Sequence, residues 1–345
     1  MSLLQETCGA ITGRNQEIEQ HIIDSWNAAS SVEQYGRLVN VVAQYGSATN
    51  QETLTIPKPC MIIASADHGV ADMGVSAYPK ETTVGMTQNY LIPKGAGANS
   101  LANYCGAQME VIDMGIDADM SWVPGLRSHK LGMGTKNFVK EPAMTREQAV
   151  EGIETGIRLV KEKIDEGFNV FLVGEMGISN TTASALMTAK FAGLTAEEAT
   201  GRGTNISDER LKLKQRIVHD VLEKYKDIPK DDAIGILSSV GGFEFACIVG
   251  VILGAAANNG LVIIDGFNTS ACALVAKTLV PEVMDYVMAS HLSAEKAAKS
   301  SLANLGLEAY VDLGLCLGEA SGSSVQMGML DLAVHMYLAI TGGKA

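Results

Sequence analysis

Short apolar runs alternate with longer amphipathic stretches along this chain, and the two patterns predict different elements. The stretches 145–166 and 207–225 repeat apolar residues at helical spacing. The apolar runs end in turns that contain glycine or an acid, and they span residues 60–69, 109–115, 169–177, 233–242 and 260–267. Strands this apolar are typical of parallel sheets that are covered on both faces. The middle of the chain is therefore predicted to form βα units around a mostly parallel sheet.

The two ends of the chain carry long amphipathic stretches and few strand candidates. We predict that residues 1–44 and 271–345 pack together as a small helical domain. Residues 45–270 would form a large α/β nucleotide-binding domain, whose site loops extend to residue 325. The run at 245–257 is too short to span a bilayer and predicts a buried helix. The predicted fold class is α/β, with a mostly parallel, Rossmann-like sheet domain beside the helical one.

Composition narrows the class of protein. Hydrophobic residues make up 47% of the 345 residues and charged residues 19%, which suits a packed core and excludes a disordered chain. The formal net charge of −13 repels nucleic acid backbones, so we expect no nucleic-acid partner. The six cysteines lack metal-like spacing and lie mostly in apolar runs, which favours reduced thiols in the cytoplasm. The N-terminus shows no signal-peptide pattern, and we expect no membrane partner.

Ligands of open parallel sheets bind outside the carboxyl ends of the strands. The residues that follow the apolar runs are therefore the first candidates for a site: Asp67, His68, Gly69, Asp113, Glu175, Met176, Gly177, Gly241, Gly242, Asp265 and Gly266. The chain has no GxSxG elbow and no GxGxxG after a strand, which argues against a serine hydrolase and a dehydrogenase. The six histidines are scattered without metal-ligand spacing, so no metal is expected.

The segment 173–187 admits two interpretations. Glu175 follows an apolar run, and the small polar residues 179–182 lead into a helix. Hydroxyl side chains and free N–H groups at a helix start form an anion site that suits a phosphate. An ordinary helix N-cap uses the same residue types, so the pattern alone favours neither.

A glycine-rich stretch at 201–204 precedes a helix that carries Lys212 and Lys214. Either lysine could neutralise a phosphate, although solvated helix lysines are the commoner case.

The stretch LCLGEASGSSV at 315–325 places one carboxylate, Glu319, among small residues. One interpretation is that Glu319 stabilises the start of a helix, because acids favour the positive end of the helix dipole. The other is a general base in a tight, partly desolvated pocket. Since acidic first turns are common, the stretch by itself favours the helix-start role.

Taken together, these motifs resemble one family closely: nicotinate-nucleotide:dimethylbenzimidazole phosphoribosyltransferase, the CobT family of cobamide (vitamin B12) synthesis. The resemblance covers residues 60–325, and so many motifs in order make chance agreement very improbable. The matching stretches are ADHGV (66–70), GVSAYPKE (74–81), DMGID (113–117), GTKNF (134–138), EPAMT (141–145), GEMGISNTT (174–182), VGGFE (240–244), IDGF (264–267), SHLSAEK (290–296) and LGEASGS (317–323).

The resemblance implies a pentosyltransferase that moves phosphoribose from nicotinate mononucleotide to an aromatic acceptor, without a cofactor. By its place in LGEASGS, Glu319 matches the general base that takes the acceptor's proton. Glu175 would bind the donor's ribose, Lys214 its phosphate, and Tyr78 and Met86 would line the acceptor pocket. For Met86, core packing is the alternative. The remaining substrate-binding positions implied are Gly177, Ser179, Asn180, Thr181, Gly203, Ser290, Leu317 and Gly318.

One departure from the family leaves the acceptor and the assembly open. The family's N-terminal Lys-Pro-Pro-Gly-Ser-Leu-Gly-Arg-Leu segment corresponds here to SSVEQYGRL (30–38), which keeps only Gly36, Arg37 and Leu38 of it. This is either drift in a structural loop or a mark of the two-subunit ArsA/ArsB branch, which attaches phenols. The expected partner is thus a second copy or a similar subunit. The alternative function is a partner subunit with little activity alone.

Overall fold

The chain forms a six-stranded, all-parallel sheet in the order β3-β2-β1-β4-β5-β6. This computed structural model describes residues 2–343. The order is that of a doubly wound Rossmann-type sheet, because the chain runs from β1 toward one edge and from β4 toward the other. The predicted fold class is confirmed. The strands are β1 (Pro59–Ala66), β2 (Gln108–Gly115), β3 (Arg127–Ser128), β4 (Val170–Met176), β5 (Leu261–Ile263) and β6 (Val287–Met288).

Four of the predicted strands are present, and the one at 233–242 is wrong. That run forms helix α10 (Ala233–Val240), whose first turn is capped by the Asp232 carboxylate, which accepts a hydrogen bond from the Gly235 N–H at 2.9 Å. A short apolar run has the same appearance in a buried strand and in a buried helix, so periodicity could not separate them. The two-residue strands β3 and β6 are too short to leave a pattern.

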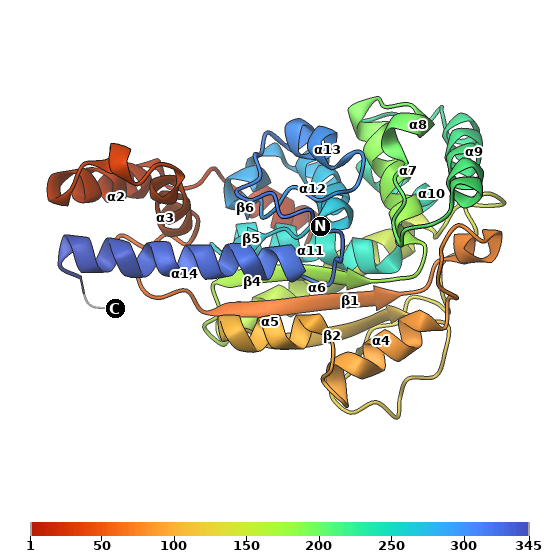
Figure 1. Ribbon diagram of the computed structural model, residues 1–345, viewed down its shortest axis with the longest axis horizontal. Coiled ribbons are helices and arrows are strands. Elements are labelled where there is room, and N and C mark those ends of the chain that lie inside the picture. Colours follow the sequence, from red (N-terminus) through yellow and green to blue (C-terminus); the bar gives the residue numbers. More distant parts are fainter. Residues whose placement is uncertain (1, 344–345) are drawn as a thin grey trace.

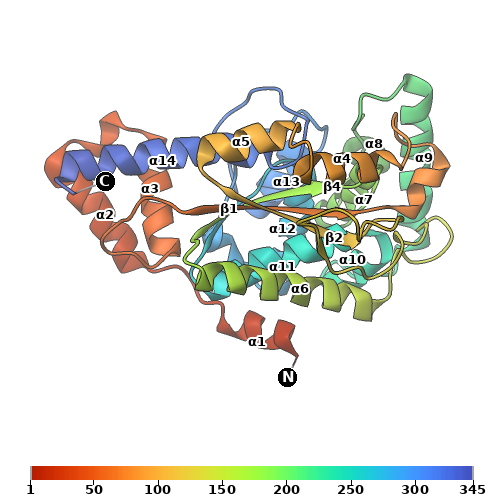
Figure 2. The same cartoon turned by 90° about the horizontal axis from the view of Figure 1, so that it is seen from below.

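Helices cover both faces of the sheet, as Figure 2 shows with the strands between two helical layers. On one face lie α4 (Thr82–Leu91), α5 (Gly97–Cys105) and α14 (Ser321–Thr341), and on the other α11 (Phe243–Ala257) packs against the strands with α6 (Arg146–Asp165) alongside. The predicted helices at 145–166 and 207–225 are confirmed as α6 and α9. The remaining α-helices around the sheet are α7 (Asn180–Ala192), α8 (Ala196–Ala199), α9 (Asp208–Lys224), α12 (Phe267–Leu279) and α13 (Ala298–Leu305).

The helices α6 and α11 are in backbone contact because glycines face each other. A Cβ atom at Gly156 would lie 2.0 Å from the carbonyl oxygen of Cys247, and one at Gly250 would lie 1.9 Å from that of Ile153. Any side chain there would force the helices apart. The buried helix predicted at 245–257 is confirmed as α11. No helix in residues 2–343 is long and apolar enough to cross a membrane.

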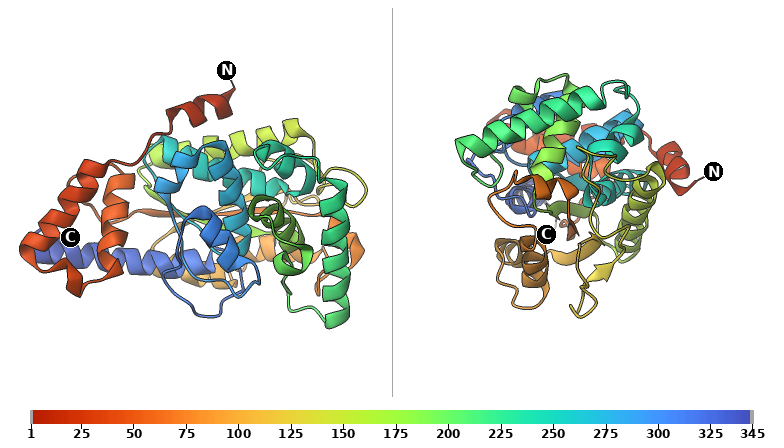
Figure 3. Two further views of the ribbon diagram at one scale, coloured as in Figure 1. Left: turned by 90° about the horizontal axis from the view of Figure 1, so that it is seen from above. Right: turned by 90° about the vertical axis from the view of Figure 1, so that its right-hand side faces the viewer.

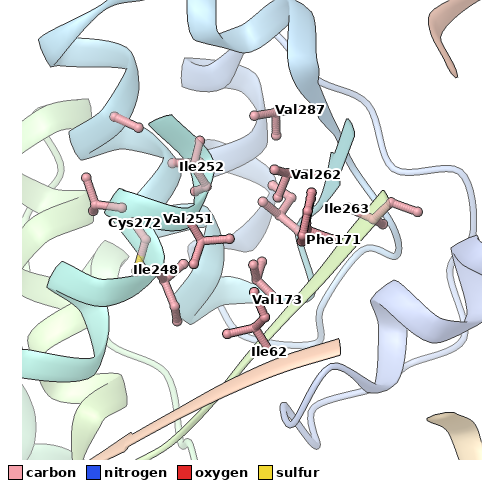
Figure 4. Packing of buried hydrophobic residues seen from close by; sticks show 14 of the residues in the cluster. Ile62, Phe171, Val173, Ile248, Val251, Ile252, Val262, Ile263, Cys272 and Val287 are labelled. Carbon is pink, nitrogen blue, oxygen red and sulfur yellow. The ribbon is translucent and has the colours of Figure 1, made fainter. Parts of the chain in front are cut away.

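The main core lies between the sheet and α11. Ile62 and Val173 are aligned partners in β1 and β4, and both point toward Ile248 and Val251 of α11 (Figure 4). All four side chains are buried. Branched side chains on adjacent parallel strands form the flat apolar surface that a helix can cover.

A separate helical unit lies at one end of the molecule, where α2 (Gln16–Ala29) and α3 (Arg37–Ala48) pack against the C-terminal part of α14 (Figures 1 and 3). The rings of Trp26 and Tyr337 join α2 to α14, with centroids 5.5 Å apart. By contrast, α1 (Leu3–Ala10) packs on α6 and α11, while α12, β6 and α13 pack beside or within the sheet. The division into domains of 45–270 and of 1–44 plus 271–345 stays a prediction, and we propose α2, α3 and α14 as the helical unit.

Candidate active site

A cavity of about 140 Å³ lies at the C-terminal edge of the sheet. Its walls come from the segments that follow β4 and β5, from the loop before α9, from the segment after β6, and from residues just before α14. The carboxyl ends of the strands are the expected ligand position of such a sheet, and here the cavity lies beyond β4 and β5. The lining includes eight of the residues to which the family resemblance assigns a role: Glu175, Gly177, Asn180, Thr181, Gly203, Leu317, Gly318 and Glu319.

Glu175 is held at the end of β4 by a chain of amide side chains. Asn180 Nδ2 donates to Glu175 Oε2, Asn268 Nδ2 donates to Asn180 Oδ1 at 3.1 Å, and Ser184 Oγ donates to Asn268 Oδ1 at 2.7 Å. Burial raises the pKa of Glu175 to about 7, although the hydrogen bonds from Asn268 and Asn180 act in the opposite direction. Glu175 is thus a carboxyl group poised to exist in both protonation states near neutral pH.

The start of α7 does not follow the ordinary N-cap pattern. Ser179 stands at the N-cap in a left-handed conformation with φ +78°, and its buried Oγ has no hydrogen-bond partner within residues 2–343. Thr181 Oγ1 instead accepts a hydrogen bond from Lys214. Unused polar groups at a helix start leave room for a ligand, which favours the anion-site interpretation of this segment.

Glu319 is a buried carboxylate in an unusual backbone conformation. Gly318, Glu319 and Ala320 are consecutive residues with positive φ values of 82°, 58° and 61°. Two of these three are not glycine, and such strain persists only where the surroundings enforce it. Burial raises the pKa of Glu319, while the nearby Tyr90 hydroxyl lowers it. Among the described residues, that hydroxyl has no hydrogen-bond partner of standard geometry.

Asp265, and not Glu319, stabilises the start of α14. Its Oδ1 accepts hydrogen bonds from the N–H groups of Gly322 and Ser323 at 2.5 and 3.1 Å. Burial raises the pKa of Asp265 to about 6, although these backbone bonds oppose the shift. Because Asp265 already caps the helix, the carboxylate of Glu319 is left free to face the cavity. The interpretation of Glu319 as a helix-start acid loses its main support.

The two lysines of α9 occupy different environments. Lys212 is exposed, whereas Lys214 is fully buried and its Nζ donates to Thr181 Oγ1 at 2.8 Å. Burial lowers the pKa of Lys214 to about 8. Gly203, with φ +54°, lies beside this ammonium, since a Cβ atom there would be 3.5 Å from Lys214 Nζ. Of the two lysines, only Lys214 is placed to serve an anion in the cavity.

A fully buried ion pair supports the floor of the site. His68 Nε2 and Glu244 Oε1 are 2.6 Å apart, and both side chains are inaccessible to solvent. Burial lowers the pKa of His68, but the carboxylates of Glu244, Asp67 and Glu175 together raise it, and the net shift is upward. Gly177 passes directly over this pair, because a Cβ atom there would lie 3.2 Å from each side chain. The pair therefore fixes the position of the loop that leads into α7.

The remaining predicted residues lie outside the cavity or at its rim. Ser290 is one layer behind the wall, where its Oγ donates to the Asp265 carbonyl oxygen at 2.6 Å. Tyr78 and Leu317 are each 57% exposed, and only Leu317 belongs to the lining. Met86 is half-buried on α4 and packs against the core. The substrate-binding roles of these residues stay predictions.

Several residues of the site had no assigned role in the sequence. Asp265 and Glu295 stand inside motifs that the sequence did single out, IDGF and SHLSAEK, yet nothing local revealed what they contact. Asn268 and Tyr90 carry no pattern at all. Asn268 donates to Asn180, and Tyr90 lies near the carboxylate of Glu319, and both contacts join segments that are distant in sequence.

Arg37 explains why part of the altered N-terminal segment is retained. Its guanidinium donates to the carbonyl oxygens of Ala309 and Glu308 and stacks 4.2 Å from the centroid of the Tyr310 ring. Arg37 begins α3, so it ties the helical unit to the segment that leads to Glu319. The preceding residues form a short 3₁₀ turn, Val32–Gln34.

Comparison with known proteins now defines the class and then the family. A doubly wound sheet with a cavity at the carboxyl ends of its strands is an arrangement that handles nucleotides, and the comparisons show that the chain is a pentosyltransferase. A family model described as "Phosphoribosyltransferase" matches residues 11–342, and the chain belongs to this family. The similarity therefore covers almost the whole chain, including both the sheet and the helical unit.

Individual relatives agree with that assignment. The chain is 41% identical over 339 residues to a nicotinate-nucleotide–dimethylbenzimidazole phosphoribosyltransferase of Geobacter sulfurreducens, covering 97% of this chain and 95% of that protein. It is 40% identical over 298 residues to a protein of the same name from Roseiflexus, covering 86% and 84%. The crystal structure of CobT from Thermus thermophilus superimposes with a TM-score of 0.88 at 32% identity, covering 95% of this chain and 99% of that one.

Proposed function

We propose that this chain transfers phosphoribose from nicotinate mononucleotide to an aromatic base of the 5,6-dimethylbenzimidazole type. The products would be nicotinate and an α-ribotide used as the lower ligand of a cobamide. The names of the relatives support this choice of donor and acceptor. The observation that carries the proposal is the buried Glu319 carboxylate, held in a left-handed backbone conformation at a cavity that also contains Thr181 and Gly203 beside Lys214.

The chemistry requires one base and no acid. The glycosidic nitrogen of the donor is already cationic, so nicotinate leaves with the electron pair of the C1′–N bond. A ring nitrogen of the acceptor attacks C1′ from the opposite face, which inverts the β-linkage to α. The acceptor's other ring nitrogen then loses its proton to Glu319, whose pKa burial has raised toward a value useful for a base.

The donor would occupy the β4–α7 side of the cavity. Glu175 and Asn180 are placed to bind the ribose hydroxyls, and Gly177 lines the same space. The phosphate would sit at Lys214, with Thr181 and Gly203 next to it. A charged hydrogen bond of this kind contributes about 2 kcal/mol to binding. Ser290 would act indirectly, by fixing Asp265.

The acceptor would enter at the rim near Leu317 and Gly318, with Tyr78 and Met86 on the approach. Small residues around Glu319 let a flat ring come close to the carboxylate. A phenol needs the same base as an azole, so Glu319 does not choose between them. The names of the relatives favour the benzimidazole, and that is the acceptor we propose.

A mass-spectrometric assay of the purified chain tests the proposal. Nicotinate mononucleotide is supplied with 5,6-dimethylbenzimidazole, phenol or p-cresol in parallel, and the α-ribotide is quantified. We expect product with dimethylbenzimidazole. Product only with phenols would correct the acceptor, and no product from a folded chain would favour the partner-subunit alternative.

We further propose that the active assembly contains two chains, either two copies or this chain with a similar subunit. Light scattering of the purified chain decides between them, because a homodimer would have twice the mass of the 36.4 kDa chain. The six cysteines are all free thiols, as expected in the reducing cytoplasm, which we propose as the location.

A further inference from the structure

The cavity wall has a charge that does not suit a phosphorylated donor. Four carboxylates line it, from Glu175, Asp265, Glu295 and Glu319, and no lysine or arginine is part of the lining among residues 2–343. The Lys214 ammonium is set behind Thr181 and Gly203. Arg202, which neighbours Gly203, points away and is bound to the Ile206 carbonyl and the Asp208 carboxylate. A nucleotide phosphate would therefore meet repulsion on entry.

Glu295 is the carboxylate nearest the place of that phosphate. Its Oε1 accepts a hydrogen bond from the N–H of Gly203 at 2.8 Å. Its Oε2 is buried without a hydrogen-bond partner in the described part of the chain. Gly201 passes so close that a Cβ atom there would lie 1.9 Å from Oε2, which fixes the carboxylate under the glycine-rich loop. Glu295 comes from the segment after β6, not from the loop itself.

Backbone N–H groups of a glycine-rich loop beside a buried lysine are the usual ligands of a phosphate. In the present structure, the Gly203 N–H is already used by a carboxylate, the side chain that most resembles a phosphate as an acceptor. Lys214 Nζ donates only to Thr181 Oγ1 among residues 2–343, although an ammonium has three donors. Two groups that can bind an anion are thus present, the Gly203 N–H and the Lys214 ammonium, and the N–H already donates to a side chain.

We propose that Glu295 is a stand-in for the donor phosphate and sets the affinity of the anion subsite. Before the donor binds, the Glu295 carboxylate holds the Gly203 loop in place; the phosphate then displaces it and takes over the Gly203 N–H and Lys214. Glu295 is a specificity-determining residue rather than a catalytic one. This inference rests on the proposed phosphate position at Lys214.

Binding of nicotinate mononucleotide and of nicotinate riboside, which lacks the phosphate, tests the proposal on the full chain by titration calorimetry. Glu295→Gln keeps the shape and removes the charge, so the Kd of the mononucleotide should fall about tenfold while that of the riboside stays unchanged. Glu295→Asp, which shortens the side chain by one methylene, should give a smaller gain. Glu209→Gln, an exposed carboxylate at the start of α9, is the matched control for net charge.

Weaker mononucleotide binding in Glu295→Gln would overturn the proposal, because it would make Glu295 a direct substrate ligand. An equal change for both ligands, or none for the mononucleotide, would also overturn it. Lys214→Ala separates this failure from that of the phosphate position. If Lys214→Ala weakens only the mononucleotide, the phosphate position stands and the Glu295 role alone is wrong. If it affects both ligands equally, the phosphate position itself is wrong.

Discussion

Asp113 in β2 and Glu175 in β4 flank β1 on its two sides, and each lies near the carboxyl end of its strand. Asp113 Oδ1 accepts hydrogen bonds from the N–H groups of Gly115 and Ile116 at 3.0 and 2.8 Å, and Oδ2 pairs with Lys130 Nζ at 2.9 Å. Within residues 2–343, Glu175 has neutral amide partners and no cation. The first acid is neutralised where it lies, and the second carries a pKa raised to about 7.

A one-residue offset in register separates the two acids. Asp113 is aligned with Ser65 of β1, whereas Glu175 is aligned with the preceding residue, Ala64. Successive side chains of a strand point to opposite faces, so the two carboxylates leave the sheet on opposite sides. Similar sequence patterns thus produce a structural ion pair in one strand and a site residue in the next.

The largest expected effect is a loss of turnover at Glu319 without a loss of stability. Glu319→Gln should lower kcat by about 10³-fold, because the base is removed while the shape remains. The Tm and the Kd of nicotinate mononucleotide should change little. Steady-state kinetics with a thermal melt checks this, with Glu308→Gln as an exposed control on the same segment. Near-normal turnover would remove Glu319 from its proposed role.

The opposite result, a loss of stability without a loss of activity, is expected for Asp113 in β2. Asp113→Asn breaks an ion pair whose carboxylate is fully buried and leaves the partly exposed Lys130 ammonium without its counter-charge, which should cost about 2 kcal/mol of unfolding free energy. Activity measured well below the Tm should stay near the wild-type value. Denaturant unfolding measures the first quantity and the assay the second. A large loss of kcat at full stability would show that Asp113 belongs to the site.

A smaller effect depends on pH. The folded-state pKa of Glu175 is raised to about 7 from an ordinary 4.5, so the folded state binds this proton more tightly than the unfolded chain. The stability it contributes is complete below pH 4.5 and is lost as pH rises through 7. The difference in unfolding free energy between wild type and Glu175→Gln should therefore decrease across that window. A constant difference would mean that Glu175 is ionised throughout.

The smallest expected change is in the KM of the acceptor, for a substitution of Tyr78 at the rim of the cavity. Tyr78→Ala should raise the KM of the acceptor by a few-fold, roughly the effect of losing partial burial of one ring, and leave the KM of the donor unchanged. Tyr104→Ala, at another exposed tyrosine on α5, is the control. An equal rise for both substrates would place Tyr78 outside the acceptor pocket.

The parallel sheet, the helices α6, α9 and α11, and the motifs that carry Glu175 and Glu319 could all be predicted from the chain, because apolar runs and helical periodicity are local properties. The error at 233–242 has the same origin, since that run is apolar in either structure. What surrounds each acid could not be predicted, because its partners come from distant segments.

The sequence by itself determined a mostly parallel, Rossmann-like sheet and a short list of acids, glycines and lysines near its edge. Only the tertiary structure decided that Lys214 rather than Lys212 is buried beside Thr181 and Gly203, that Asp265 caps α14 in place of Glu319, and that Glu295 reaches the Gly203 N–H. The physical reason is the same in each case. Burial and the choice of partner set the charge and reactivity of a side chain, and both depend on contacts between segments that only the folded chain brings together.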